Sequence, residues 1–136
     1  MPEPVDCYIG IGSNLGNRRE HIRCALRKVG ALSKTSVVRV SSIRSSKPQG
    51  GAPGQGDFLN AVIAIRTELS PQSLLLGLKE IEKSLGRRKT KQYDPRVIDL
   101  DILLYGNKFV DTVKLKIPHP RMYERDFVLK PFMELV

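Results

Sequence analysis

The order of strand-like and helix-like segments constrains the fold of this chain more than any other feature of its sequence. Apolar residues recur at helical spacing over about residues 18–31 and again after Ser70 and Pro71. Asn17 begins a sequence that resembles a capping box, and Ser followed by Pro is a strong start signal for a helix. We therefore expect one helix over about 18–31 and a second from Pro71 until Gly86.

Strand-like segments precede and follow each of these helices. The expected strands are Cys7–Gly12, Ser36–Ile43, Phe58–Thr67, Val97–Tyr105 and, more weakly, Phe109–Ile117, and a short helical tail covers about residues 125–135. The order β-α-β-β-α-β, with a β appendix, predicts a ferredoxin-like α+β fold, an antiparallel sheet with helices packed on it. Right-handed crossovers place both main helices on one face of that sheet.

Two irregular segments interrupt this pattern. Ser45–Asp57 holds two prolines and four glycines, and Arg87–Arg96 begins with a run of basic residues. No periodic element can pass through the first segment, so we expect a long loop there. Loops of this length in a small domain are usually functional or disordered.

Composition excludes several classes of protein. The 136 residues fit one domain, residues 1–136, which is long enough to bury a sizeable core. No apolar run suits a membrane span, the acidic start is unlike a secretory signal, and two Cys make neither a disulfide framework nor a metal cluster. We therefore expect a cytoplasmic protein without a membrane partner. The net charge of +9 points to a polyanion: a nucleic acid, an acidic membrane surface or a nucleotide.

Two carboxylates in the segment 97–105 form the most informative pattern. Asp99 and Asp101 should share one face of a strand, about 6–7 Å apart along the chain. The other face receives the apolar residues Ile98, Leu100, Ile102 and Leu104. Neighbouring carboxylates repel each other, and a divalent cation such as Mg²⁺ bound between them would remove this repulsion. The alternative is a solvent-facing pair without a function. The basic residues just upstream favour a phosphoryl-transfer site, although no Walker A sequence is present.

Two further clusters are candidates for ligand contacts. His119 lies between two prolines that hold its backbone stiffly, and Arg125 and Phe127 follow it. Alternation places Phe58 and Asn60 on one face of a strand, an aromatic platform beside an amide that can donate and accept hydrogen bonds. Taken alone, a single His such as His119 is more often structural, and Phe58 is more often a core residue.

Four motifs occur in order between about Cys7 and Glu134. They are Gly-Ser-Asn-Leu-Gly at 12–16, Asp-Phe-Leu-Asn-Ala at 57–61, Pro-Arg-Val-Ile-Asp-Leu-Asp-Ile at 95–102, and Pro-His-Pro-Arg-Met to Arg-Asp-Phe at 118–127. Together they resemble the 6-hydroxymethyl-7,8-dihydropterin pyrophosphokinases of folate biosynthesis. The resemblance implies transfer of pyrophosphate from ATP to the pterin hydroxymethyl group, release of AMP, two Mg²⁺ ions, and loops at 45–57 and 87–96 that close over the substrates. We expect a monomer.

The resemblance also implies roles for individual residues. Those expected to hold both metals are Asp99 and Asp101. Those expected around the pterin are Ser46, Lys47, Gln49, Phe58, Asn60, Asp99 and Phe127. Those expected around ATP are Glu82, Arg87, Lys89, Tyr93, Arg96, Ile102, His119 and Arg125. The expected catalytic set is Arg87, Lys89, Arg96, Asp99 and Asp101.

Some residues depart from the family pattern, and two alternatives stay open. Tyr93 stands where the family usually has Trp, and Gln92 and Asp94 replace a basic and a small residue. The chain ends at Val136, where many relatives continue, so we expect a compact member or a shortened chain. The alternatives are a basic nucleic-acid-binding module and a catalytically silent relative that serves as an interaction domain. Carboxylates on a central strand would repel a phosphate backbone, so we expect no nucleic-acid partner.

Overall fold

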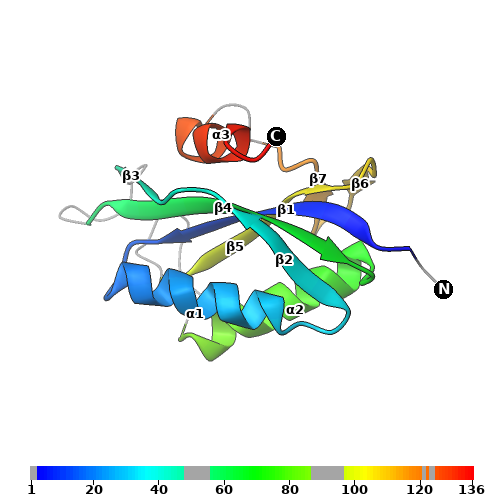
Figure 1. Cartoon of the computed structure of the whole chain (residues 1–136), viewed down its shortest axis with the longest axis horizontal. Coiled ribbons are helices and arrows are strands. Elements are labelled where there is room, and N and C mark those ends of the chain that lie inside the picture. The colour runs from blue at the N-terminus through cyan, green and yellow to red at the C-terminus, as the bar shows by residue number, and fades with distance from the viewer. Residues whose placement is uncertain (1–2, 48–55, 87–96, 121, 123–124) are drawn as a thin grey trace.

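An antiparallel sheet forms the centre of the structure, with two helices on one face and a third helix on the other (Figure 1). The computed structural model describes residues 3–47, 56–86, 97–120, 122 and 125–136. The elements in chain order are β1 (Val5–Ser13), α1 (Arg18–Gly30), β2 (Thr35–Val40), β3 (Arg44–Ser46), β4 (Phe58–Thr67), α2 (Pro71–Ser84), β5 (Asp99–Tyr105), β6 (Val110–Asp111), β7 (Lys116–Ile117) and α3 (Asp126–Met133).

The order of the strands confirms the predicted topology. The sheet runs β2-β4-β1-β5, and β3 pairs with β4 beyond the end of β2. All of these pairings are antiparallel. The helices α1 and α2 lie together on one face, as right-handed crossovers require (Figure 1). The small hairpin β6-β7 forms a separate two-stranded sheet.

Both main helices begin where their start signals predict. The side chain of Asn17 accepts a hydrogen bond from the backbone N–H of Glu20 at 3.3 Å, and Ser70 Oγ accepts one from Ser73 at 3.1 Å. Each bond satisfies a backbone donor that the first helical turn leaves without a partner. After α2, Gly86 has a φ of +94°, a left-handed conformation that costs glycine little and ends the helix.

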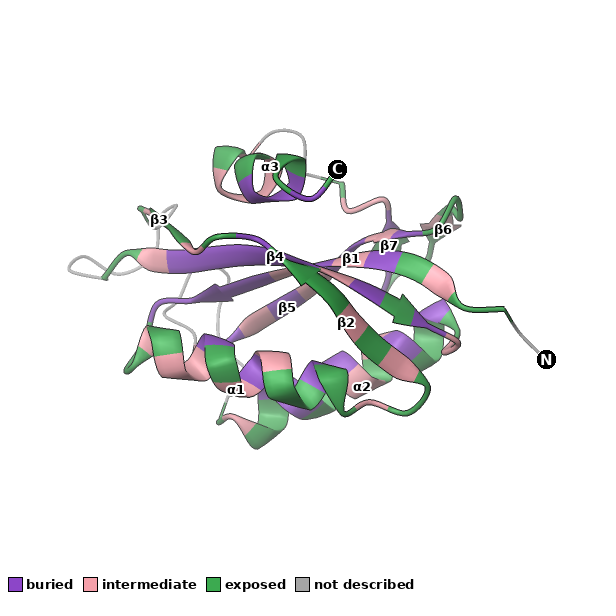
Figure 2. Cartoon of the chain, viewed as in Figure 1, coloured by how far each residue is buried: buried purple, intermediate pink, exposed green. Residues whose placement is uncertain are grey.

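Buried apolar side chains form two cores, one on each face of the sheet. Figure 2 shows the buried residues along the central strands and on parts of the helices. The larger core, called here the helix-face core, joins β1, β4 and β5 to α1 and α2. Full burial of a Leu or Ile contributes about 1.5–3 kcal/mol, so this core supplies most of the apolar driving force. The smaller one, called here the α3-face core, consists of Val62, Leu103, Met122, Phe132 and Leu135.

One expectation about β5 is wrong, because the strand contains a bulge. Tyr8 pairs with Leu104 but the next residue of β1, Ile9, pairs with Ile102, so Leu103 is an extra residue in the ladder. A bulge re-aims the side chains that follow it. Leu104 therefore packs against the α3-face core instead of joining Ile102 on the helix face.

The boundaries of the strand expected over 36–43 and of the loop expected over 45–57 also differ from the prediction. The strand expected over 36–43 ends at Val40, because the hydroxyl of Ser41 takes over as the acceptor for the backbone N–H of Val62 at 2.8 Å. The loop expected over 45–57 starts later, because residues 44–46 form β3 and pair with residues 58–60. Three paired residues are too few to show a periodic pattern. Residues 48–55 of that loop lie outside the described part of the chain.

The expected single strand over 109–117 is wrong as well. The structure has two short strands, β6 and β7, joined by a turn. Thr112 makes this turn, since its Oγ1 donates to the carbonyl of Leu115 at 3.1 Å and accepts from the Leu115 N–H at 3.0 Å. A Thr side chain that bonds its own turn competes with an extended ladder.

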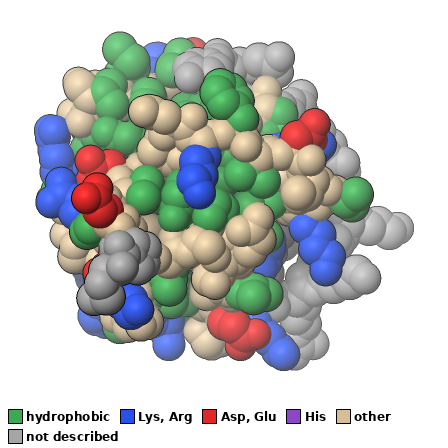
Figure 3. All heavy atoms as spheres, turned by 90° about the vertical axis from the view of Figure 1, so that its right-hand side faces the viewer, with side chains coloured by type: hydrophobic (Ala, Val, Ile, Leu, Met, Phe, Trp, Pro, Cys, Tyr) green, Lys and Arg blue, Asp and Glu red, His purple; other side chains and the backbone are tan. Residues whose placement is uncertain are grey.

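The surface, the helices and the cysteines add three further observations. On the face that lies to the right in Figure 1, Lys and Arg side chains alternate with Asp and Glu and do not collect into one basic patch (Figure 3). Within the described ranges, no helix is both long enough and apolar enough to cross a bilayer. Both cysteines are free, with Cys7 buried and Cys24 half-buried.

Candidate active site

A pocket lies on the face of the sheet that carries α3. Its walls come from β1, β3, β4, β5, the segment after β7 and the start of α3. It brings together most of the described residues that the sequence predicts for a site, namely Ser46, Lys47, Phe58, Asn60, Asp99, Asp101, His119, Arg125 and Phe127. Residues from four strands and the C-terminal helix thus meet in one place.

Two glycines of the central strand β1 form the floor of this pocket. Gly12 is paired with Asn60 of β4 on one side and with Asp99 of β5 on the other, and Gly10 is paired with Asp101. A Cβ on Gly12 would lie only 3.3 Å from Asn60 Oδ1, which is a tight contact. Glycine inside a strand often marks a place where a ligand approaches the backbone closely. The missing side chains leave room for a ligand above β1.

The two aspartates point into the pocket, as their alternation predicts. Asp99 and Asp101 are half-buried and line the pocket, whereas Leu100 and Ile102 belong to the helix-face core. No group of three or more His, Cys, Asp or Glu side chains suited to a metal occurs among the described residues. Two carboxylates alone still fit Mg²⁺, which is usually held by one or two carboxylates together with water and substrate phosphates.

Two aromatic rings and an amide line the part of the pocket near β3 and β4. Phe58 and Phe127 come from different elements, one from β4 and the other from α3. Asn60 is buried, and its Nδ2 donates to Ser46 Oγ at 2.7 Å and to the carbonyl of Arg44 at 3.5 Å. These two bonds hold the amide in one orientation, with Oδ1 toward Gly12.

Cationic side chains and a histidine line the same pocket. The backbone N–H of His119 donates to the carbonyl of Leu103 at 3.0 Å, which holds this residue beside β5. The guanidinium of Arg125 lies 5.5 Å from the centre of the Phe127 ring, a cation–π distance. Its Nε is buried and makes no hydrogen bond to any residue that the structure describes. A buried donor without a partner costs about 1–3 kcal/mol, so an anionic ligand at this place would be favoured.

Two predicted site residues do not line the pocket. Glu82 is buried, accepts a hydrogen bond from the backbone N–H of Leu100 at 2.8 Å and lies 3.4 Å from Lys79 Nζ. It therefore ties α2 to β5. The side chain of Ile102 is buried in the helix-face core. Contacts of these two residues with ATP stay a prediction.

The remaining predicted residues lie outside the described part of the chain. They are Gln49, Arg87, Lys89, Tyr93 and Arg96. Sequence reasoning in turn missed Gly10 as part of the floor and Val128 as part of the wall. Gly10 and Gly12 stand at alternate positions of a strand, and this spacing is a signal that could have pointed to the floor.

Comparison with known proteins identifies the family of the chain. The family model for 7,8-dihydro-6-hydroxymethylpterin-pyrophosphokinase (HPPK) matches residues 8–136 of this chain. The chain belongs to the HPPK family. HPPK family members are pyrophosphokinases, which are enzymes that transfer a diphosphate group.

Similar proteins come from distant organisms. The chain is 44% identical to a 2-amino-4-hydroxy-6-hydroxymethyldihydropteridine pyrophosphokinase of Haemophilus influenzae over 131 residues, 96% of this chain and 81% of the relative. Identity with the enzyme of that name from Aquifex aeolicus is 41%, over 94% of this chain and 78% of the relative. It is 45% identical to the folic acid synthesis protein fol1 of Pneumocystis carinii, over 94% of this chain but only 17% of that much longer protein.

A solved structure shares the fold. It is described as an HPPK-DHPS crystal structure in complex with substrates, and it superimposes with a TM-score of 0.66 over 95% of this chain and 39% of that chain. At 14% identity, this likeness shows the HPPK fold alone. It agrees with the ferredoxin-like fold of this chain, in which the sheet β2-β4-β1-β5 carries the two main helices on one face (Figure 1).

Proposed function

We propose that this chain transfers the pyrophosphoryl group of ATP to the hydroxymethyl group of 6-hydroxymethyl-7,8-dihydropterin and releases AMP. One observation carries the proposal: a single pocket is lined by two carboxylates, two phenylalanine rings, a buried amide and cationic side chains. A flat heterocycle needs the rings and the amide, and a metal-bound polyphosphate needs the charged groups. Membership in the HPPK family supports this assignment.

Asp99 and Asp101 are the residues proposed to hold two Mg²⁺ ions. Bound there, Mg²⁺ would neutralise charge on the triphosphate and orient it. The carboxylates stand opposite glycines, so nothing on β1 obstructs the space above them. Asp99 is also the group assigned to polarise the hydroxyl of the pterin.

The pterin is proposed to lie between Phe58 and Phe127, where its flat ring would stack on the aromatic side chains. In nucleic-acid complexes, such stacking contributes about 1–3 kcal/mol per base. Because Asn60 Nδ2 is occupied by Ser46 Oγ and the carbonyl of Arg44, its Oδ1 is the atom that would accept from ring N–H groups. Lys47 and Gln49 complete this end of the proposed site.

The phosphate oxygens are proposed to meet His119 and Arg125, whose buried Nε makes no hydrogen bond within the described residues. Arg87, Lys89 and Arg96 are assigned to the same task, and Glu82, Tyr93 and Ile102 to the nucleoside, by resemblance alone. In the reaction, the hydroxyl oxygen attacks the β-phosphorus of ATP. The bond from that phosphorus to the α–β bridging oxygen breaks, AMP leaves with this oxygen, and the hydroxyl proton passes to solvent by way of Asp99.

The proposal also covers the domain organisation, the oligomeric state and the cellular location. We infer one domain over residues 1–136, a monomer and a cytoplasmic location, all from the sequence. Size-exclusion chromatography with light scattering tests the monomer directly, since a dimer would have twice the 15.3 kDa mass of one chain.

Product analysis tests the proposed reaction. The protein is incubated with ATP, Mg²⁺ and 6-hydroxymethyl-7,8-dihydropterin, and the nucleotides are separated by chromatography. We expect AMP to accumulate in step with pterin consumption and to be absent without the pterin. Formation of ADP, or no change in ATP, would refute the assignment.

A further inference from the structure

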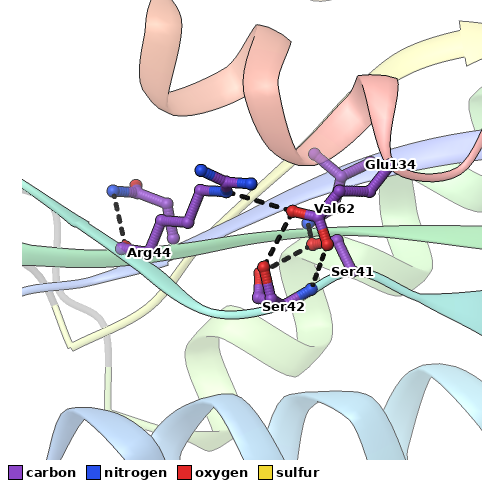
Figure 4. A network of polar contacts seen from close by, with 6 residues as sticks. Ser41, Ser42, Arg44, Val62 and Glu134 are labelled. Atoms are coloured by element: carbon purple, nitrogen blue, oxygen red, sulfur yellow. Dashed lines mark hydrogen bonds and ion pairs between the residues drawn. The ribbon is translucent and has the colours of Figure 1, made fainter.

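Three hydrogen-bond donors converge on the carboxylate of Glu134, just after α3 ends (Figure 4). The backbone N–H of Ser42 donates to Oε1 at 3.0 Å, the Ser42 hydroxyl donates to Oε2 at 2.8 Å, and Arg44 Nε donates to Oε2 at 3.0 Å. Hydrogen bonds to an ionised acceptor are about twice as strong as neutral ones. These contacts lower the pKa of Glu134 from its usual value, chiefly through the Ser42 backbone bond.

The partners of Glu134 lie between β2 and the start of β3, with Ser42 in the connecting segment and Arg44 as the first residue of β3. The neighbouring residue Leu135 is held from the same side, because Arg39 donates to its carbonyl at 3.0 Å. The chain just after α3 is therefore bonded to both β2, through Arg39, and β3, through Arg44. The start of α3 carries Phe127 and Val128, which line the pocket.

The same part of the chain also contacts another wall of the pocket, the one that carries Asn60. Arg44 pairs with Asn60 across β3 and β4, and its carbonyl accepts from Asn60 Nδ2. Ser46, two residues further on, accepts the second bond from that amide. The segment 42–46 thus contacts Glu134 through Ser42 and the Arg44 side chain, and it contacts Asn60 through the Arg44 carbonyl and Ser46 Oγ.

We propose that Glu134 is a positioning residue for the acceptor end of the pocket. By clamping the β2–β3 connection to the end of α3, its carboxylate holds the Phe127 wall and the Asn60 wall at the spacing that a planar ring requires. This inference rests on the proposed function, since it assumes that the pterin binds between these two walls. Glu134 itself does not line the pocket, so it acts through the residues that do.

A carboxylate suits this task better than a neutral side chain. It accepts all three bonds at once, whereas the amide of a glutamine would turn its N–H₂ group toward at least one of these donors. Glu134→Gln keeps the size of the side chain and removes this match. Because Phe127 and Asn60 face the acceptor, the effect should fall on the pterin and spare ATP.

The experiment compares steady-state kinetics of Glu134→Gln with the wild type and with Asp6→Asn. Asp6 is a matched control, because Arg66 Nε also donates to its carboxylate at 3.0 Å, far along the sheet from the pocket. We expect Glu134→Gln to raise the KM for the pterin about tenfold, with the KM for ATP unchanged and Asp6→Asn like the wild type. Glu134→Asp, which keeps the charge, should restore part of the loss.

A milder variant keeps the test decisive if Glu134→Gln does not fold. Ser42→Ala removes only the hydroxyl bond and should raise the pterin KM by a smaller factor in the same direction. A wild type without pterin-dependent AMP formation would refute the proposed function. An active wild type whose pterin KM is unchanged in Ser42→Ala and in any folded Glu134→Gln would overturn the positioning role alone. Equal increases in the KM for pterin and for ATP would overturn it as well, because they indicate a general loss of structure.

Discussion

The two faces of the sheet are built from alternate residues of the same strands, yet they differ in how far apolar packing covers them. Along β1, Cys7, Ile9 and Ile11 are buried in the helix-face core, whereas Gly10 and Gly12 turn a bare backbone to the pocket. The helix face is continuous and apolar. The other face is apolar only beneath the end of α3 and elsewhere carries glycines, carboxylates and an amide.

This difference separates stability from chemistry. Close packing of the helix face supplies most of the apolar burial, while the pocket face gives up packing to leave space above β1. Substitutions on one face should therefore change the free energy of unfolding, and substitutions on the other should change turnover or substrate affinity. Each of the following predictions tests whether the two faces are separable in this way.

The largest effect is expected at Asp101. Asp101→Asn keeps the size of the side chain but removes the charge proposed to hold Mg²⁺, so kcat should fall by about 10²–10³-fold or more. The midpoint of thermal unfolding should stay close to that of the wild type. AMP formation measures the first quantity and circular dichroism the second, with Asp6→Asn as the control. A near wild-type rate would mean that the paired carboxylates are structural.

The next effect is expected in the helix-face core. Leu74 on α2 is completely buried, and Leu74→Ala should lower the free energy of unfolding by about 2–5 kcal/mol. Leu76 on the same helix is 67% exposed, so Leu76→Ala should change stability by less than about 0.5 kcal/mol. Urea titration gives these values, and activity per folded molecule should be unchanged in both. A specific loss of turnover in Leu74→Ala would break the separation of the two faces.

A smaller effect is expected at the floor of the pocket. Gly12→Ala places a methyl group 3.3 Å from Asn60 Oδ1 and 3.5 Å from the Phe58 ring, so the KM for the pterin should rise about tenfold. Gly10→Ala is the matched variant, because the nearest neighbour of its methyl group is Leu103 at 3.5 Å, an ordinary contact. It should have the weaker effect on the pterin KM. Equal effects of the two substitutions would contradict the steric account.

The smallest effect concerns alkaline pH. Burial, assisted by the nearby Asp6 charge, raises the pKa of the Cys7 thiol from 9.0 to about 12. Above pH 9 the unfolded chain therefore loses a proton that the folded chain keeps, so stability should fall as pH rises from 9 toward 12. Urea titrations at pH 8 and pH 10 measure this fall, which should be smaller in Cys7→Ala. The same fall in both proteins would assign it to another group, and burial also raises the pKa of Tyr105.

Local signals predicted the fold well wherever one element carried its own pattern. The range of β4, the start of α2 at Ser70 and Pro71, and the shared face of Asp99 and Asp101 all follow from spacing and capping. Each depends on contacts between near neighbours or on a period of two, so the sequence alone shows it.

Features that depend on distant residues could not be predicted in this way. The bulge at Leu103 arises from pairing with β1. The short strand β3 forms only through its pairing with residues 58–60 of β4. Glu134 looks like an ordinary surface residue in the sequence, yet its partner Ser42 is 92 positions away. The burial of Glu82 beneath β5 depends likewise on how α2 packs.

The most direct test of the central claim follows the β-phosphorus of ATP. ATP labelled at this position is incubated with Mg²⁺, the pterin and either the wild type or Asp101→Asn, and the label is traced by chromatography. Transfer of a diphosphate predicts that the wild type moves the label to the pterin, leaving unlabelled AMP, and that Asp101→Asn leaves it in ATP. Label retained in ADP by the wild type, or transferred equally well by the variant, would contradict the claim.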